Sequence, residues 1–146
     1  MNKTRQQRFA LRIALFILQK NGFPQPKKKH VLNFVRDKRL LQFPEEELQK
    51  RRTSDHDEIW ENDIAWKRKD LYLDGEIDDS EFGHWRLTNI GVKNIDRQKE
   101  KWLKLESPEE KRRVLSELDY WTEDLLLWML KIARGDSLSL KKETPT

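Results

Sequence analysis

One segment near the start of the chain, Phe9 to Leu18, is apolar at every position except Arg12. We place a helix at Thr4 to Lys20, in which Phe9, Ile13 and Ile17 line one face and Leu11, Leu15 and Leu18 widen this apolar face. The segment is shorter than the roughly 18 apolar residues of a membrane-spanning helix. We therefore expect this helix to be the most buried element of a protein without a membrane span.

The remaining composition allows only one modest core. Of the 146 residues, 38% are charged and 36% are hydrophobic, which predicts one compact domain with a helical extension. The chain has no cysteine, so disulfides, thiol catalysis and Cys-ligated metals are excluded. The same absence fits a reducing location, and we expect the protein to be cytoplasmic and associated with the nucleoid.

The net charge of +4 is unevenly distributed. Residues 1–52 contain 14 basic and 4 acidic residues, whereas residues 53–106 contain 9 basic and 14 acidic ones. This asymmetry favours an N-terminal region that faces a polyanion, although solvated helix faces would give the same counts. Lys27, Lys28 and Lys29 are the strongest candidates for phosphate contacts, because three cations at the start of a helix oppose its dipole unless anions lie nearby.

Further helices follow from the apolar spacing. We expect a helix from Lys27 with Val31, Phe34 and Val35 on its apolar side, a short helix from Pro44 to Arg51, and a longer one that ends at Leu73. Asp55 with Glu58 is the capping signal for the longer helix.

The longer helix divides into three sectors on a helical wheel. Two of them are apolar arcs, formed by Trp60, Ile64 and Leu71 and by Ile59, Trp66 and Leu73. The third sector contains Glu61, Asn62, Ala65, Arg68, Lys69 and Tyr72. We expect a partner to be contacted through this third sector.

The second half of the chain predicts a hairpin and two more helices. Residues 76–78 and 84–87 flank a turn, a helix starts near Thr88, and Ser107-Pro108-Glu109-Glu110 is a strong start for a last helix. That last helix has an apolar face formed by Val114, Leu118, Trp121, Leu125, Trp128 and Ile132. We predict a winged-helix domain over 1–103, a C-terminal helix over 104–135 and a disordered tail over 136–146.

The order of elements is that of a winged helix-turn-helix, and the local sequence sharpens the match. The stretch from Trp60 to Trp66, then Leu71, Gly75 and Ile77, then Gly83-His84-Trp85-Arg86-Leu87-Thr88-Asn89-Ile90-Gly91, resembles the N-terminal winged-helix domain of Mrr-type restriction proteins. The resemblance implies a mainly α winged helix-turn-helix with a small β-hairpin wing. It also implies a domain that recognises DNA for an effector.

Three features depart from that family pattern. Lys67 replaces a small apolar residue, Glu76 occupies a position that is usually apolar, and the turn with Asp78, Asp79 and Glu81 is acidic where a phosphate-binding wing should be basic. The acidic turn keeps a second interpretation open, a winged-helix module that binds another protein. Our first interpretation is a non-catalytic DNA-binding protein that serves target recognition in a restriction or defence system, or transcriptional regulation.

The DNA contacts that we expect come from seven side chains. Asn62 can bond an adenine edge, and Arg68, Lys69 and Arg86 can reach guanine or phosphate, in addition to Lys27, Lys28 and Lys29. Asn62 could equally make a structural hydrogen bond beside the wing. We assign Trp60, Trp66 and Trp85 to the core in preference to a cage around a flipped base.

We expect no catalytic group, cofactor or metal site. The only Glu-x-Lys sequence, Glu109 to Lys111, opens a helix and follows no strand, and the histidines lack metal-ligand spacing. The expected partners are double-stranded DNA and a second copy of the chain. A second copy would cover the apolar face of the C-terminal helix, for which the first helix of the same chain is the alternative cover.

Overall fold

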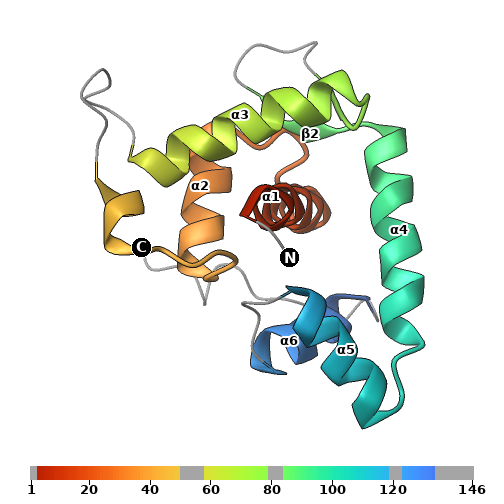
Figure 1. Cartoon of the computed structure of the whole chain (residues 1–146). Coiled ribbons are helices and arrows are strands. Elements are labelled where there is room, and N and C mark those ends of the chain that lie inside the picture. The colour runs from red at the N-terminus through yellow and green to blue at the C-terminus, as the bar shows by residue number, and fades with distance from the viewer. Residues whose placement is uncertain (1–2, 50–57, 79–83, 119–122, 134–146) are drawn as a thin grey trace.

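The structure, a computed structural model, describes residues 3–49, 58–78, 84–118 and 123–133. Its elements are α1 (Lys3–Lys20), α2 (Lys28–Asp37), a 3-10 helix η1 (Glu45–Leu48), α3 (Ile59–Leu73), β1 (Ile77–Asp78), β2 (Arg86–Leu87), α4 (Asn89–Leu103), α5 (Pro108–Leu118) and α6 (Glu123–Ala133), drawn in Figure 1. Helices followed by a small hairpin and further helices confirm the mainly α, winged-helix class.

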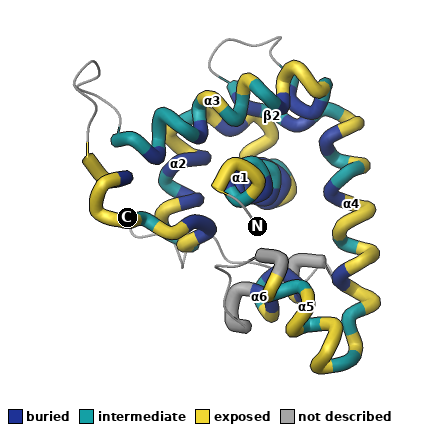
Figure 2. The backbone as a smooth tube through the Cα atoms, viewed as in Figure 1, coloured by how far each residue is buried: buried dark blue, intermediate teal, exposed yellow. Residues whose placement is uncertain are grey.

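Helix α1 lies at the centre of the molecule. Figure 1 shows it end-on with α2, α3 and α4 around it, and it contacts all three of these helices and β2. Every residue from Phe9 to Leu18 except Arg12 is buried. Figure 2 views α1 end-on and shows dark blue behind its exposed first turn. The expectation that the first helix is the most buried one is confirmed.

The hairpin completes the winged-helix order. Strands β1 and β2 are antiparallel, with Ile77 opposite Leu87 and Asp78 opposite Arg86. A third short segment joins them, because Lys27 forms an isolated antiparallel bridge with His84. The chain therefore has a strand-like residue between α1 and α2, as a winged helix does. The turn at 79–83, which includes Asp79 and Glu81, lies outside the described residues.

The helix starts follow local capping chemistry. The Thr88 side chain accepts a hydrogen bond from the Gly91 amide, at the helix start that the sequence predicted. The Ser107 hydroxyl accepts one from the Glu110 amide, as the predicted cap residue. At α3 the prediction named Asp55, which lies outside the described residues. Glu58 is the N-cap residue there, and its backbone amide donates to the Glu61 carboxylate.

Two expectations about the middle helices were wrong. The helix placed at Pro44 to Arg51 is described only as the 3-10 turn Glu45–Leu48. In α3 the arc of Trp60, Ile64 and Leu71 is buried, but Trp66 and Leu73 are 55% and 70% exposed. Trp66 and Leu73 of the second arc therefore face solvent, and Trp66 does not belong to the core.

The C-terminal helices join the same core. Leu126, Met129 and Leu130 of α6 are buried, and α6 packs against α4. Trp128 is half-buried, with its ring centroid 6.3 Å from that of Phe34 in α2. The last helix, which the sequence predicted as one element, is described as two helices, α5 and α6, and the residues buried in α6 are not members of the predicted apolar face.

Parts of the C-terminal predictions fall on segments that the structure leaves undescribed. Residues 119–122, which include Trp121, and the tail 136–146 lie outside the described ranges, and the domain boundaries and the homodimer stay predictions. Across the described ranges, no helix combines the length and the apolar character that crossing a membrane requires.

Candidate nucleic-acid interface

The outward face of α3 forms a shallow hollow. It is lined by Asn62, Ala65, Trp66, Arg68, Lys69, Tyr72 and Leu73. All residues of the third sector except Glu61 are in this set, so the surface that the sequence singled out exists as one continuous face. The exposed side chains of Trp66, which was expected in the core, and of Leu73 add apolar area to this face.

The two neighbouring cations of α3 lie in different environments. Lys69 is exposed, and its Nζ lies 5.3 Å from the centroid of the Trp66 ring. Arg68 is half-buried, and its guanidinium carbon lies 5.4 Å from the ring centroid of Trp85, a buried residue beside β2. Both distances are within the range of cation–π contacts. The exposed Trp66 ring therefore positions the Lys69 ammonium group, whereas Arg68 connects α3 to the hairpin.

The lysines that precede and open α2 are tied to the same hairpin. Lys27 forms the bridge with His84, and the Trp85 amide donates to the Pro26 carbonyl at 2.6 Å. Lys27 and Lys29 are exposed and Lys28 is half-buried. Because Trp85 contacts the segment before α2 on one side and Arg68 on another, it links the Lys27–Lys29 cluster with α3.

Arg86 has an acidic partner within the hairpin. Its guanidinium forms an ion pair with the carboxylate of Asp78, the residue opposite it in the strand register. The Arg86 side chain remains 41% exposed. Asp78 thus balances part of the Arg86 charge inside the hairpin. Its carboxylate is therefore a partner for a cation and not only a group that would repel phosphates.

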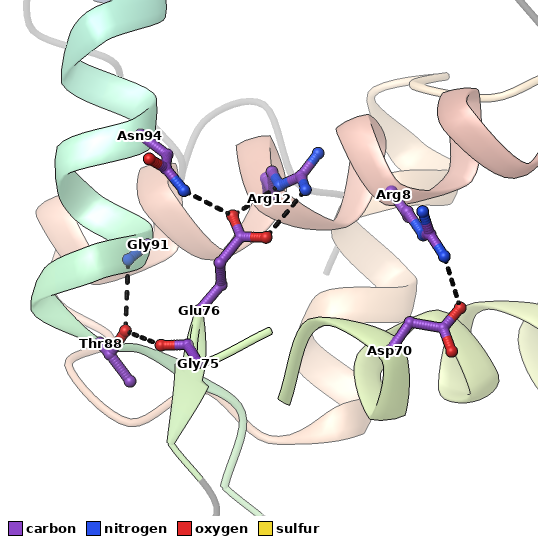
Figure 3. A network of polar contacts seen from close by, with 8 residues as sticks. All are labelled: Arg8, Arg12, Asp70, Gly75, Glu76, Thr88, Gly91 and Asn94. Atoms are coloured by element: carbon purple, nitrogen blue, oxygen red, sulfur yellow. Dashed lines mark hydrogen bonds and ion pairs between the residues drawn. The ribbon is translucent and has the colours of Figure 1, made fainter. Parts of the chain in front are cut away.

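The base of the hairpin is fixed by a buried carboxylate, shown in Figure 3. Both oxygens of Glu76, which is 4% exposed, accept hydrogen bonds of 2.9 Å from Arg12 of α1. Asn94 of α4 donates to the same carboxylate at 3.2 Å. Burial alone raises the pKa of Glu76, but the hydrogen bonds from Arg12 and Asn94 and the nearby positive charges outweigh burial and lower the pKa. Glu76, an acidic residue at a position that is usually apolar in the family, is therefore compensated by Arg12, the one polar residue between Phe9 and Leu18.

A glycine brings α4 close to the same strand. A Cβ atom at Gly91 would lie 2.4 Å from the backbone oxygen of Glu76, a separation that real structures do not contain. Thr88 adds two bonds here, because its amide donates to that Glu76 oxygen and its hydroxyl to the Gly75 oxygen. These contacts set how the hairpin and α4 meet.

Sequence reasoning missed the Arg12–Glu76–Asn94 network, although a lone arginine in an apolar segment and a lone glutamate at an apolar position were two visible signals for it. Within the described ranges, no group of three or more His, Asp or Glu side chains could hold a metal ion. His56 lies outside these ranges.

Comparison with known protein families identifies a match over most of the chain. A family model described as the Mrr N-terminal domain matches residues 5–97. Neither the curated proteins nor the solved structures contain a match to the chain. The matched range starts in α1 and ends in α4, so it includes the α3 face, the Lys27–Lys29 cluster and the hairpin.

Proposed function

The chain belongs to the family of the Mrr N-terminal domain, and from this premise we propose that it is a non-catalytic winged-helix protein that binds double-stranded DNA through α3. The family is that of an N-terminal domain and not of a catalytic nuclease domain. Target recognition for a restriction or defence system is the role that this membership favours, and transcriptional regulation is the alternative role. A cytoplasmic, nucleoid-associated location is part of the proposal.

The observation that carries the proposal is the outward face of α3. An α-helix fits the major groove, where asparagine bonds adenine and lysine or arginine bonds guanine. Asn62 and Lys69 line the same hollow and lie seven residues, or two helical turns, apart. Both side chains can therefore contact base edges from one helix face.

Backbone contacts would come from the residues around the hairpin. The Lys27–Lys29 cluster lies at the start of α2, whose first turn has no acidic residue, and the positive end of a helix dipole favours phosphate. Trp85 connects this cluster to α3. Phosphate contacts of this kind position a recognition helix without reading the sequence.

The second candidate function, protein binding, is favoured by exposed apolar side chains. Trp66, Tyr72 and Leu73 of α3 are 55%, 46% and 70% exposed, and Ile90 at the start of α4 is 55% exposed. Aromatic residues on such a face are typical anchors of protein–protein interfaces. A protein partner would use this apolar part of the face and would not need Lys69.

Binding to generic duplex DNA at increasing salt separates the two functions. A DNA-binding protein loses affinity steeply with salt, because phosphate contacts release counterions, whereas a protein-binding module shows no DNA binding at any salt concentration. Fluorescence anisotropy with a labelled duplex measures this directly.

Variants then test whether α3 contacts base edges. Asn62→Ala and Lys69→Ala should each lower discrimination between preferred and unrelated duplexes by about 1 to 3 kcal/mol. Arg112→Ala, which removes an exposed cation of α5 outside the hollow, is the matched control. An equal loss on every duplex would mean that these residues only position the helix, and unchanged binding would remove α3 from the interface.

A further inference from the structure

Helix α4 presents a row of cations that the proposed function does not use. Lys93, Arg97, Lys101 and Lys104 follow one another at spacings of four, four and three residues, and all four are exposed. Such spacings place them along one face of the helix. The buried residues of α4, Gly91, Ile95 and Trp102, occupy the opposite face. We call these four cations the α4 row.

The α4 row is not neutralised within the part of the chain that the structure describes, where none of its four side chains is in an ion pair. Lys99 on the same helix differs, since its Nζ lies 3.8 Å from Asp96 and 5.5 Å from the ring centroid of Phe16. Like charges four residues apart on a helix destabilise it by a few tenths of a kcal/mol. The row therefore costs stability unless an anion lies against it.

The C-terminal part of the α4 row faces a surface hollow where α4 meets α5. Arg97, Lys101 and Lys104 line this hollow together with Arg113 of α5. Two carboxylates, Glu100 and Glu110, are also part of the lining. Glu110 is engaged locally, because its side chain accepts a hydrogen bond from the Glu106 amide at the start of α5. Four cations against two carboxylates leave the hollow positive.

The length of the α4 row fits a nucleic-acid strand. From Lys93 to Lys104 the helix rises about 16 Å, which equals the axial length of about five phosphates of one DNA strand. Helix α4 also starts directly after β2 and contacts it, so the row begins at the end of α4 that adjoins the hairpin. We propose that the α4 row, with Arg113, is a second contact surface for the phosphate backbone of nucleic acid that does not distinguish base sequences.

The test measures binding of the full chain to a generic labelled duplex by fluorescence anisotropy between about 50 and 200 mM salt. We expect the triple variant Arg97→Gln, Lys101→Gln, Lys104→Gln to bind at least about tenfold more weakly at the lower salt concentration and to reduce the salt slope by about three. Arg112→Gln, a cation of α5 that does not line the hollow, is the control and should bind like the wild type. Circular dichroism melting checks that each variant folds.

Glu100→Gln gives an independent readout, because it should tighten binding at low salt, and structural damage does not produce tighter binding. Wild-type affinity in the triple variant together with an unchanged Glu100→Gln variant would overturn the proposal. If the triple variant binds normally while Lys69→Ala and Asn62→Ala lose affinity or discrimination, the α3 function stands and the α4 surface falls. If the triple variant loses affinity while Lys69→Ala and Asn62→Ala bind and discriminate like the wild type, the result supports the α4 surface and removes α3 from the interface. Binding to polyglutamate but to no duplex would assign the row to an acidic protein and overturn the nucleic-acid proposal.

Discussion

At the scale of single residues, the ion pair of Arg12 and Glu76 is the contact on which the hairpin base most depends. Arg12→Ala should lower the free energy of unfolding by about 2 to 3 kcal/mol, because it leaves a carboxylate that is 4% exposed with only the Asn94 hydrogen bond. Urea denaturation followed by circular dichroism measures the loss.

The neighbouring Arg8 supplies the matched control. It lies one turn earlier on α1 and pairs with Asp70 at 3.1 Å, but both side chains are more than a third exposed. Arg8→Ala should therefore cost less than about 1 kcal/mol. Replacing both charges of this pair, Arg12→Met with Glu76→Leu, should recover most of the loss. Equal losses for Arg8→Ala and Arg12→Ala would show that burial of the pair is unimportant.

The same carboxylate gives the protein a dependence on pH. The pKa of Glu76 is lowered from its usual 4.5 in the folded chain, so folding favours the ionised form, and this stabilisation is complete well above that pH. It is lost as the pH falls through the lowered pKa. We expect the free energy of unfolding to decrease below about pH 4.5, less so in the Arg12→Met, Glu76→Leu variant. Parallel pH curves for both proteins would contradict this assignment.

At the scale of elements, the cluster of Lys27, Lys28 and Lys29 tests the basic start of α2. Replacing all three by alanine should weaken binding similarly for every duplex and reduce the salt slope by up to about three, since such contacts neutralise phosphates. Salt titrations with two unrelated duplexes measure both effects. A change in preference between the duplexes would instead indicate a contact with base edges, and an unchanged slope would remove the cluster from the interface.

The elements were predictable where their signals are local. The caps at Thr88 and Ser107 and the apolar segment of α1 lie within a few residues of the features they determine, so sequence alone located these helices. The exposure of Trp66 was not predictable, because a helical wheel gives arcs but does not say how many of them find a packing partner. The pairing of Arg12 with Glu76 spans 64 residues and becomes visible only when α1 and β1 meet.

The candidate interface, too, was predictable where its signals are local and not where they depend on tertiary packing. The third sector of α3 was identified from spacing, since one face of a helix is fixed by its period. The partners of Arg68 and Arg86 were not, because they depend on where the hairpin lies. The α4 row was hidden because residues 53–106 are acidic in sum, and a block count does not separate the faces of a helix.

At the scale of the whole molecule, the C-terminal helices determine whether the chain is stable by itself. Leu126, Met129 and Leu130 are buried in the same core as Trp102 of α4 and Phe34 of α2. Deleting residues 107–146 would expose part of that core, so we expect the remnant to lose its cooperative thermal transition or to aggregate. Circular dichroism melting and light scattering record the two outcomes.

The predicted homodimer is checked on the intact chain by analytical ultracentrifugation. The covered face of α6 is occupied by its own core, so a second copy would have to use residues that remain exposed, such as Leu127 at 43%. A dimer through this helix should therefore dissociate on Leu127→Lys without a loss of melting temperature, whereas Leu126→Lys should unfold the chain. A single monomeric species at tens of micromolar, on the order of the protein concentrations at which weak dimers form, would refute the dimer.

A truncated 1–106 chain that remains folded, monomeric and able to bind duplex DNA would show instead that the C-terminal helices serve assembly and not the core.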